Sequence, residues 1–205
     1  MCARSISTVD VQDSLFHQCR CEGKNESELG GGGILIRNVN SPSVSASAFI
    51  DNYCGRDGAG ISLDNSNAPV QQVILNCRFI KCISNGVSAD GGGVHIWDNE
   101  RNLGFSNCVF SLCESNADGG ALFHHLILAE TEPSICFCFF HQNKGSSGND
   151  INIYPSGSSK TILHCFSTST GIPRIYPSCH DNAWLPQGSI YFVNSTTEEA
   201  IGTDR

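Results

Sequence analysis

The segment Phe79-Ile80-Lys81-Cys82, followed nine residues later by Gly91-Gly92-Gly93-Val94, decides the fold of this 205-residue chain. A phenylalanine with Cys or Asn three positions later occurs in five copies. The phenylalanines are Phe16, Phe49, Phe79, Phe110 and Phe140, at steps of 33, 30, 31 and 30 residues. Three positions later stand Cys19, Asn52, Cys82, Cys113 and Asn143. A recurring step of this size is typical of a solenoid or a propeller.

The glycine-rich turns follow the same period. They are Gly31-Gly32-Gly33-Ile34, Gly58-Ala59-Gly60-Ile61, Gly91-Gly92-Gly93-Val94 and Gly119-Gly120-Ala121-Leu122. Apolar residues then alternate, as at Val94 and Ile96, which indicates short, half-buried strands. Such strands must pair with the same strand of the next turn, about 4.8 Å away. A propeller would need hairpin dipeptides at regular spacing, and few occur.

We therefore predict an all-β fold, a right-handed parallel β-helix built as a single-stranded solenoid of about six to seven turns. The five phenylalanines are expected to stack as one internal ladder. The Cys or Asn three residues later is expected where the chain turns, with asparagines bonding amide to amide along the axis. Glycine before the next strand allows positive φ or close backbone approach.

Length and composition agree with one β-rich unit. Only 16% of residues are charged and 21 are glycine, which favours strands and tight turns over helices. We expect a single domain over 1–205 that is a fragment of a larger repeat protein. The best-defined repeats occupy 11–153, and 154–205 holds degenerate repeats and a C-terminal segment.

Charge and hydropathy exclude two classes of partner. A net charge of −8 with 12 Lys and Arg offers no basic stripe, so nucleic acid is not expected to bind. No stretch approaches eighteen consecutive apolar residues, so this segment is not expected to insert into a membrane. The first residues, Met1 to Ser7, lack the apolar core of a secretory signal, which we interpret as a truncated start.

The iteration of Phe-x-x-Asn with a motif close to Gly-Gly-Ala-Ile, from Leu15 to Ile153, resembles a known repeat family. It is similar to the chlamydial polymorphic outer membrane proteins and to β-helix repeats in protist surface proteins. Phe49 to Asn52 matches the first motif outright, and Gly119 to Leu122 is close to the second. The resemblance implies a β-helical passenger displayed outside a cell for adhesion or antigenic variation, and it implies no catalysis.

The twelve cysteines mostly follow the repeat, since Cys77 and Cys82 return as Cys108 and Cys113. We interpret them as buried thiols in core ladders. Disulfides are the alternative, with Cys54 and Cys179 as the first candidates. The Cys19-x-Cys21 spacing does not match a zinc ribbon or knuckle, and no metal or cofactor is expected.

Catalysis would need carboxylates that converge on one groove. Asp57, Asp90 and Asp118 each precede a glycine turn, so they are expected on neighbouring turns, where they could share a proton or Ca²⁺. The simpler interpretation is that each aspartate starts its turn through a side-chain acceptor. The predicted function is a non-catalytic extracellular or cell-surface module for adhesion or display. A carbohydrate-active lyase or hydrolase and a structural spacer are the alternatives.

The loops between each phenylalanine and the next glycine turn differ in length and are the expected binding side. The longest, Glu22 to Leu29, contains Glu22, Lys24, Glu26 and Glu28 and forms an acidic patch. The expected ligand is a protein or a glycan. Asn25-Glu26-Ser27 and Asn194-Ser195-Thr196 are sequons, so Asn25 and Asn194 are candidate glycosylation sites.

Overall fold

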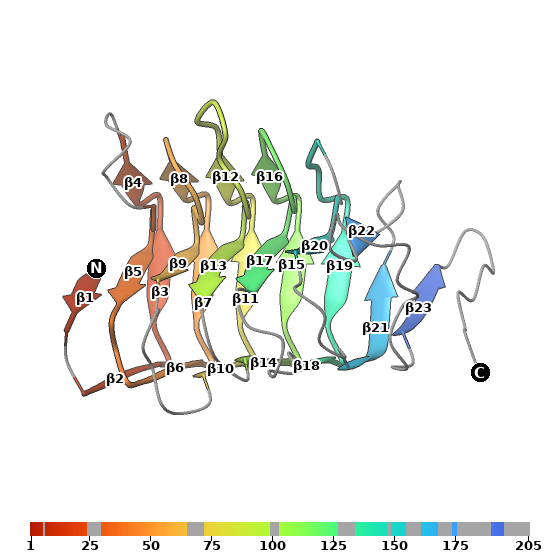
Figure 1. The fold of residues 1–205 in the computed structure, drawn as a ribbon, viewed down its shortest axis with the longest axis horizontal. Coiled ribbons are helices and arrows are strands. Elements are labelled where there is room, and N and C mark those ends of the chain that lie inside the picture. The colour runs from red at the N-terminus through yellow and green to blue at the C-terminus, as the bar shows by residue number, and fades with distance from the viewer. Residues whose placement is uncertain are drawn as a thin grey trace.

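The computed structural model describes the backbone of ten segments of the chain. They are residues 1–5, 7–23, 30–64, 72–98, 103–126, 134–146, 149–154, 161–167, 174–175 and 190–194. Every element in them is a strand, and each turn of the chain places its strands beside those of the previous turn (Figure 1). The prediction of an all-β, right-handed parallel β-helix is confirmed.

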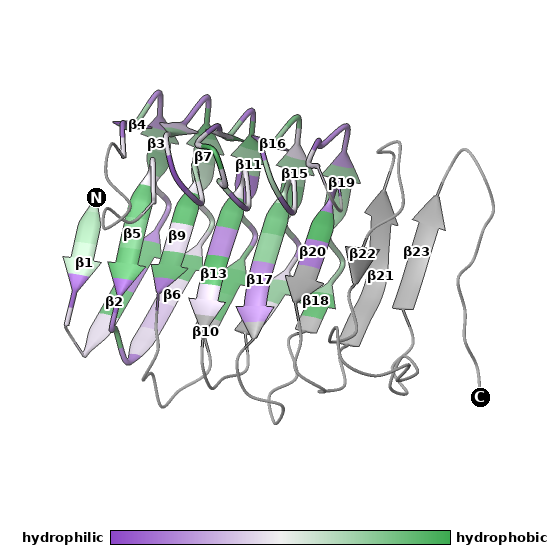
Figure 2. Cartoon of the chain, turned by 45° about the horizontal axis from the view of Figure 1, so that its top comes forward, coloured by the Kyte–Doolittle hydropathy of each residue, from purple (hydrophilic) through white to green (hydrophobic). Residues whose placement is uncertain are grey.

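The first strand of each turn belongs to a seven-stranded parallel sheet. In order, the strands are β1 (Cys2–Arg4), β5 (Ile34–Arg37), β9 (Ile61–Asp64), β13 (Val94–Asp98), β17 (Leu122–Leu126), β20 (Ile151–Tyr154) and β22 (Arg174–Ile175). Strand β5 is apolar along most of its length, whereas β13 and β17 carry hydrophilic stretches (Figure 2). The sheet therefore changes chemical character along the axis.

Two further ladders follow in each turn. The second comprises β2 (Thr8–Gln12), β6 (Ser41–Ser45), β10 (Gln72–Leu75), β14 (Leu103–Ser106) and β18 (Ser134–Cys136). The third comprises β3 (Leu15–His17), β7 (Ala48–Ile50), β11 (Arg78–Ile80), β15 (Val109–Ser111) and β19 (Phe139–His141). Strand β21 (Thr161–Ser167) joins them because it pairs with both β18 and β19, and β23 (Ile190–Asn194) pairs with β21.

A short fourth ladder closes the first four turns. It contains β4 (Arg20–Cys21), β8 (Tyr53–Cys54), β12 (Ile83–Ser84) and β16 (Glu114–Ser115). Among the described residues of the fifth turn, an isolated bridge from Lys144 to Glu114 takes the place of the fourth strand. Strand β21 then continues as one strand past the place where earlier turns have a corner. The described residues thus form about four complete turns, fewer than the six to seven expected.

The anchor phenylalanines lie in the third ladder and stack in the interior. Successive ring centroids, from Phe16 to Phe49, Phe79, Phe110 and Phe140, are 4.9, 4.9, 4.8 and 5.1 Å apart. The last four rings are fully buried. Stacked aromatic pairs contribute about 0.5–1.5 kcal/mol each beyond the area they bury, so this ladder is a principal stabiliser of the coil.

Residues with positive φ explain the spacing of three between Phe and Cys or Asn. In a regular strand, residues i and i+3 point to opposite faces. Here the residue just before the Cys or Asn is left-handed, for example Lys81 with φ of 52° before Cys82. This single residue turns the corner, so that Phe79 and Cys82 both point inward and are fully buried.

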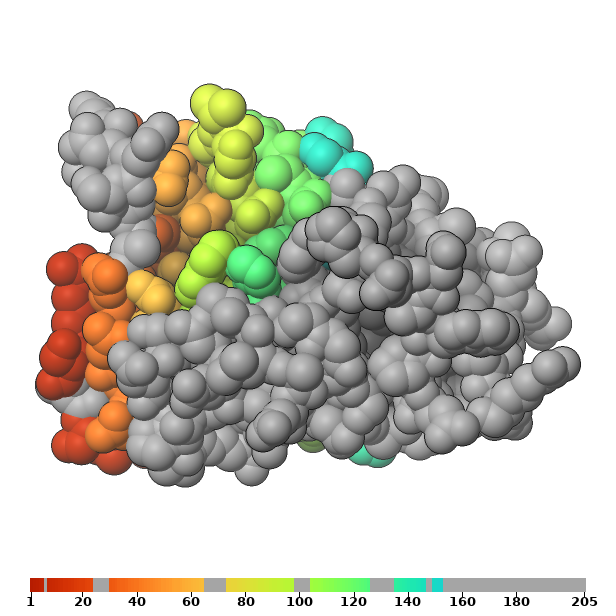
Figure 3. All heavy atoms as spheres, viewed as in Figure 1, coloured from red at the N-terminus to blue at the C-terminus, as the bar shows by residue number. Residues whose placement is uncertain are grey.

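Among the described residues, no helix is long and apolar enough to cross a membrane. Successive turns lie side by side along the solenoid axis, and on one face the space-filling view shows them as adjacent bands of colour (Figure 3).

Candidate functional site: an Asp, Asp, His cluster beside the glycine turns

The aspartates before the glycine turns occupy equivalent positions in successive turns. Oδ1 of Asp57 accepts a 2.8 Å hydrogen bond from the backbone N–H of Asp90. Oδ1 of Asp90 in turn accepts a 2.8 Å bond from the N–H of Asp118. Two of the three carboxylates therefore tie one turn to the next, whereas the turn interpretation expected each aspartate to accept a bond within its own turn.

The glycine after each aspartate is required by the backbone. Gly58 has φ of +63°, and a Cβ there would lie 2.2 Å from the carbonyl oxygen of Ile61. Gly91 repeats this geometry one turn later. Because the glycine turn has the same backbone geometry in both coils of the solenoid, Asp57 and Asp90 occupy equivalent positions beside the first sheet.

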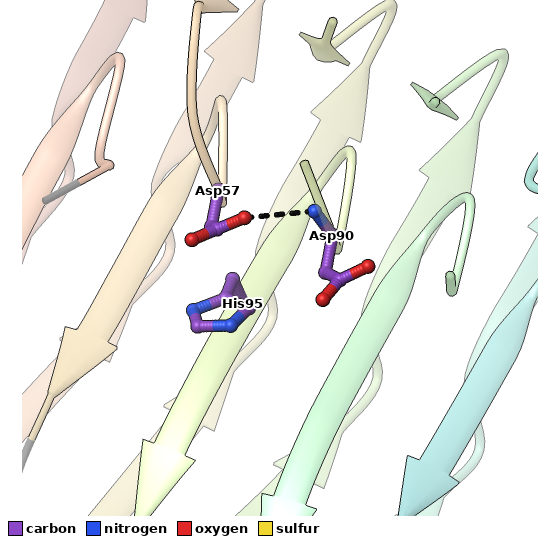
Figure 4. A group of neighbouring side chains, drawn as sticks. All are labelled: Asp57, Asp90 and His95. Atoms are coloured by element: carbon purple, nitrogen blue, oxygen red, sulfur yellow. Dashed lines mark hydrogen bonds between the residues drawn. The ribbon is translucent and has the colours of Figure 1, made fainter. Parts of the chain in front are cut away.

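The structure adds a third group, His95 of β13, to the first two aspartates. One ligand atom from each of Asp57, Asp90 and His95 lies within 4.8 Å of the other two. Figure 4 shows the imidazole, from β13, below the Asp57 carboxylate and beside the Asp90 carboxylate. Asp118 is not part of this group, so the three candidate aspartates do not act as one set.

The His95 ring is held between neighbours. Its side chain is 6% exposed, and its ring stacks on Phe123 with centroids 5.4 Å apart and an interplanar angle of 4°. The Nδ1 atom is buried and has no hydrogen-bond partner. Buried polar atoms in native proteins are nearly always bonded to protein, water or an ion, so this nitrogen requires an explanation.

Electrostatics favour a neutral imidazole next to a partly protonated acid. Burial lowers the pKa of His95, although the negative charge of Asp57 acts against this. Burial also raises the pKa of Asp90 to about 7; the hydrogen bond from the Asp118 amide lowers it, and the charges of Asp57 and Asp118 raise it further. At neutral pH the cluster thus offers carboxylate oxygens and an imidazole lone pair, which are ligands for a metal or partners for a proton.

Sequence analysis missed His95, although a signal existed. The equivalent residues in the turns before and after are Ser62 and Phe123. A histidine that occurs in one turn only, at a position facing repeated aspartates, marks a local break in the repeat. Recognising it required knowledge that the outward side of β13 lies beside the aspartate turn.

From the second turn on, the Cys or Asn residue three positions after the anchor phenylalanine, which follows a left-handed corner residue, donates a hydrogen bond to the backbone of the preceding turn. Nδ2 of Asn143 donates 3.1 Å to the carbonyl of Phe110, and Sγ of Cys82 donates 3.4 Å to the carbonyl of Phe49. The expected amide-to-amide ladder is wrong, because Asn52 and Asn143 are separated by two cysteine turns. Thiol and amide can replace each other here because both donate to the same kind of acceptor.

The ten cysteines whose side chains are described are thiols. Cys77 and Cys108 are in contact in one buried ladder and Cys82 and Cys113 in another, and burial raises the pKa of Cys82 well above its usual range. Burial likewise raises the pKa of Cys54 to about 12, and this residue lies in register with Cys21 rather than off the repeat. Cys179 lies outside the described residues.

Several sequence candidates fall outside the described part of the chain. They are Lys24, Glu26, Glu28 and the sequon residue Asn25. Glu22 is described and exposed, and Asn194 is the last residue of β23.

Comparison of the chain with protein-family models, with curated proteins and with solved structures gives no match.

Proposed function

We propose that this chain is a non-catalytic extracellular or cell-surface β-helix module for adhesion or display, with a protein or a glycan as its ligand. The proposal rests on the resemblance of its repeats to those of the polymorphic outer membrane proteins. The observation that supports it best is the regular polar outward face of β2 and β6. The outward side chains of these strands are Thr8, Asp10, Gln12, Ser41, Ser43 and Ser45.

A face of this kind suits extended ligands. Side chains one turn apart are separated by the strand spacing of about 4.8 Å, and those along a strand by about 7 Å. Thr8 pairs with Ser41 and Asp10 with Ser43, so the hydroxyl and carboxylate groups form a two-dimensional array. Such an array allows several weak contacts to act together on one chain of a glycan or on one protein surface.

The carbohydrate-active alternative has less support. Asp57 and Asp90 each use one carboxylate oxygen to bind the next turn. Ligand atoms of the pair lie within 4.8 Å, whereas glycosidases hold their two carboxyl groups about 5–5.5 Å apart for retention and about 6.5–9.5 Å apart for inversion. The pair therefore lacks the wide separation of an inverting site, and each carboxylate already has one oxygen bonded to the backbone.

The proposal is tested by attachment and cleavage assays on the same purified chain. Beads coated with the chain should attach saturably to at least one member of a panel of glycans and extracellular-matrix proteins. The chain should not depolymerise acidic polysaccharides. Cleavage that disappears in Asp90→Asn would replace the adhesion proposal with the enzyme alternative.

Three variants, one of them a control, then locate the contact. Ser43→Arg places a bulky cation in the centre of the polar face, and Ile50→Arg does the same on the adjacent face of β7 as a control. Shortening the loop from Glu22 to Leu29 tests the acidic loop. Weaker attachment in Ser43→Arg or in the shortened loop, with Ile50→Arg unchanged, assigns the binding surface. Equal attachment in all three variants contradicts both assignments.

A further inference from the structure

We propose that Asp57, Asp90 and His95 form a binding site for a divalent transition metal ion, with Zn²⁺ as the best-fitting ion. The site is independent of the adhesion proposal and joins two adjacent turns of the solenoid. Asp57 precedes β9 in one turn, while Asp90 and His95 belong to the next.

A buried nitrogen of His95 points to a ligand at this site. An acidic pair alone is common at turns and indicates no ligand. Here, however, Nδ1 of His95 is buried without a partner, and the residue is only 6% exposed. A nitrogen of the same ring lies within 4.8 Å of a carboxylate oxygen of each aspartate. A metal ion at this point would satisfy an imidazole nitrogen and two carboxylate oxygens at once.

The three side chains of the cluster are also already oriented by contacts outside the site. Each carboxylate uses Oδ1 for a backbone N–H of the next turn, which leaves Oδ2 to take the ion. Stacking on Phe123 fixes the plane of the His95 ring. Hydrogen bonds and packing of this sort, outside the ligands themselves, are what orients metal ligands in proteins and raises affinity.

The donor set selects the kind of ion. Calcium takes six to eight oxygens, and this cluster supplies too few. Zinc accepts carboxylate oxygen and imidazole nitrogen together and is commonly held by three protein groups plus water. Ligand atoms around tetrahedral zinc lie about 3.3 Å apart for bonds of about 2.0 Å, so groups within 4.8 Å need only small side-chain rotations to close on the ion.

The test uses the full chain, with accessible thiols alkylated so that they do not compete for zinc. Equilibrium dialysis against zinc chloride with elemental analysis should give about one Zn²⁺ per chain. Asp57→Asn, Asp90→Asn and His95→Gln should each weaken binding at least tenfold. Asp118→Asn, which changes the equivalent aspartate one turn later and outside the cluster, should bind zinc as the wild type does.

X-ray absorption at the zinc edge on the wild-type chain decides the ligands even where a variant fails to fold. The proposal expects a first shell of nitrogen and oxygen at about 2.0–2.2 Å. A sulfur shell at about 2.3 Å, wild-type affinity in all three cluster variants, or no zinc retained by the wild type would overturn it.

Discussion

The side-chain amide of Asn52 donates a 3.0 Å hydrogen bond to the carbonyl oxygen of Phe16, one turn earlier in the solenoid. Its Oδ1 accepts a 2.9 Å bond from the backbone N–H of Cys19. One buried side chain therefore satisfies a donor and an acceptor of the neighbouring turn. The Cys82 thiol, at the equivalent position one turn later, donates to the carbonyl of Phe49 and so satisfies only an acceptor.

Replacing Asn52 should separate these two contributions. Asn52→Ala leaves the Cys19 N–H and the Phe16 carbonyl without partners and should lower the free energy of unfolding by about 2–4 kcal/mol. Asn52→Cys keeps a donor, as at Cys82, and should cost clearly less. Urea denaturation of both variants measures the difference; equal losses would show that the thiol does not substitute for the amide.

Phe79 occupies the centre of the aromatic stack. Phe79→Ala removes a fully buried ring with stacked neighbours on both sides and should cost about 3–5 kcal/mol in unfolding free energy. Phe137→Ala is the matched control, because this corner phenylalanine is 59% exposed and should cost little. A near-neutral Phe79→Ala in denaturant titrations would contradict the interior register.

Asp90 should make the metal-free protein less stable as pH rises. Its pKa is about 7 in the folded chain and about 3.9 when unfolded, so the folded state holds the proton more strongly. The resulting stabilisation is present below about pH 4 and is lost as pH rises to about 7. The difference in unfolding free energy between wild type and Asp90→Asn, measured with a chelator present at pH 5 and pH 7.5, isolates this group. A difference independent of pH would refute the shift.

Native thiols should divide into fast and slow classes. Cys2 is exposed, whereas Cys82 is buried and its pKa is raised, so little thiolate forms there. A short iodoacetamide pulse followed by peptide mass spectrometry should label Cys2 quickly and Cys82 only in denaturant. Comparable labelling of both in native buffer would mean that the interior opens readily.

The fold could be predicted from the sequence because its determinants are repeated. Phe79 and Phe110 stand at the same place in turns of nearly equal length, and parallel pairing in register follows from that spacing. The cluster could not be predicted from spacing alone, although the unrepeated His95 marks a local break in the repeat. Its meeting with Asp57 depends on how an outward side chain packs over a neighbouring turn, which no spacing rule describes.

The number of complete turns could not be predicted from the repeat motif either. Each anchor tetrapeptide marks a corner, but only the backbone shows whether a fourth strand completes the turn. At Lys144 the fourth ladder reduces to a single bridge, and β21 continues as one strand past the place of the corner between β18 and β19. The fourth strand is lost while the anchor motif Phe140 to Asn143 is still present, so counting anchors overestimates the number of complete turns.

The left-handed corners determine where this chain can change length during evolution. The left-handed residues on either side of the third strand are five positions apart in each of the first five turns, as with Asn76 and Lys81 or Asn107 and Leu112. All variation in the steps of 33, 30, 31 and 30 residues therefore falls in other connections. An insertion or deletion between the two corners would rotate the inward residues out of the interior and remove them from their ladders. An insertion or deletion in the remaining connections would change only the length of a surface loop. Related chains that carry this solenoid should therefore differ first in those loops.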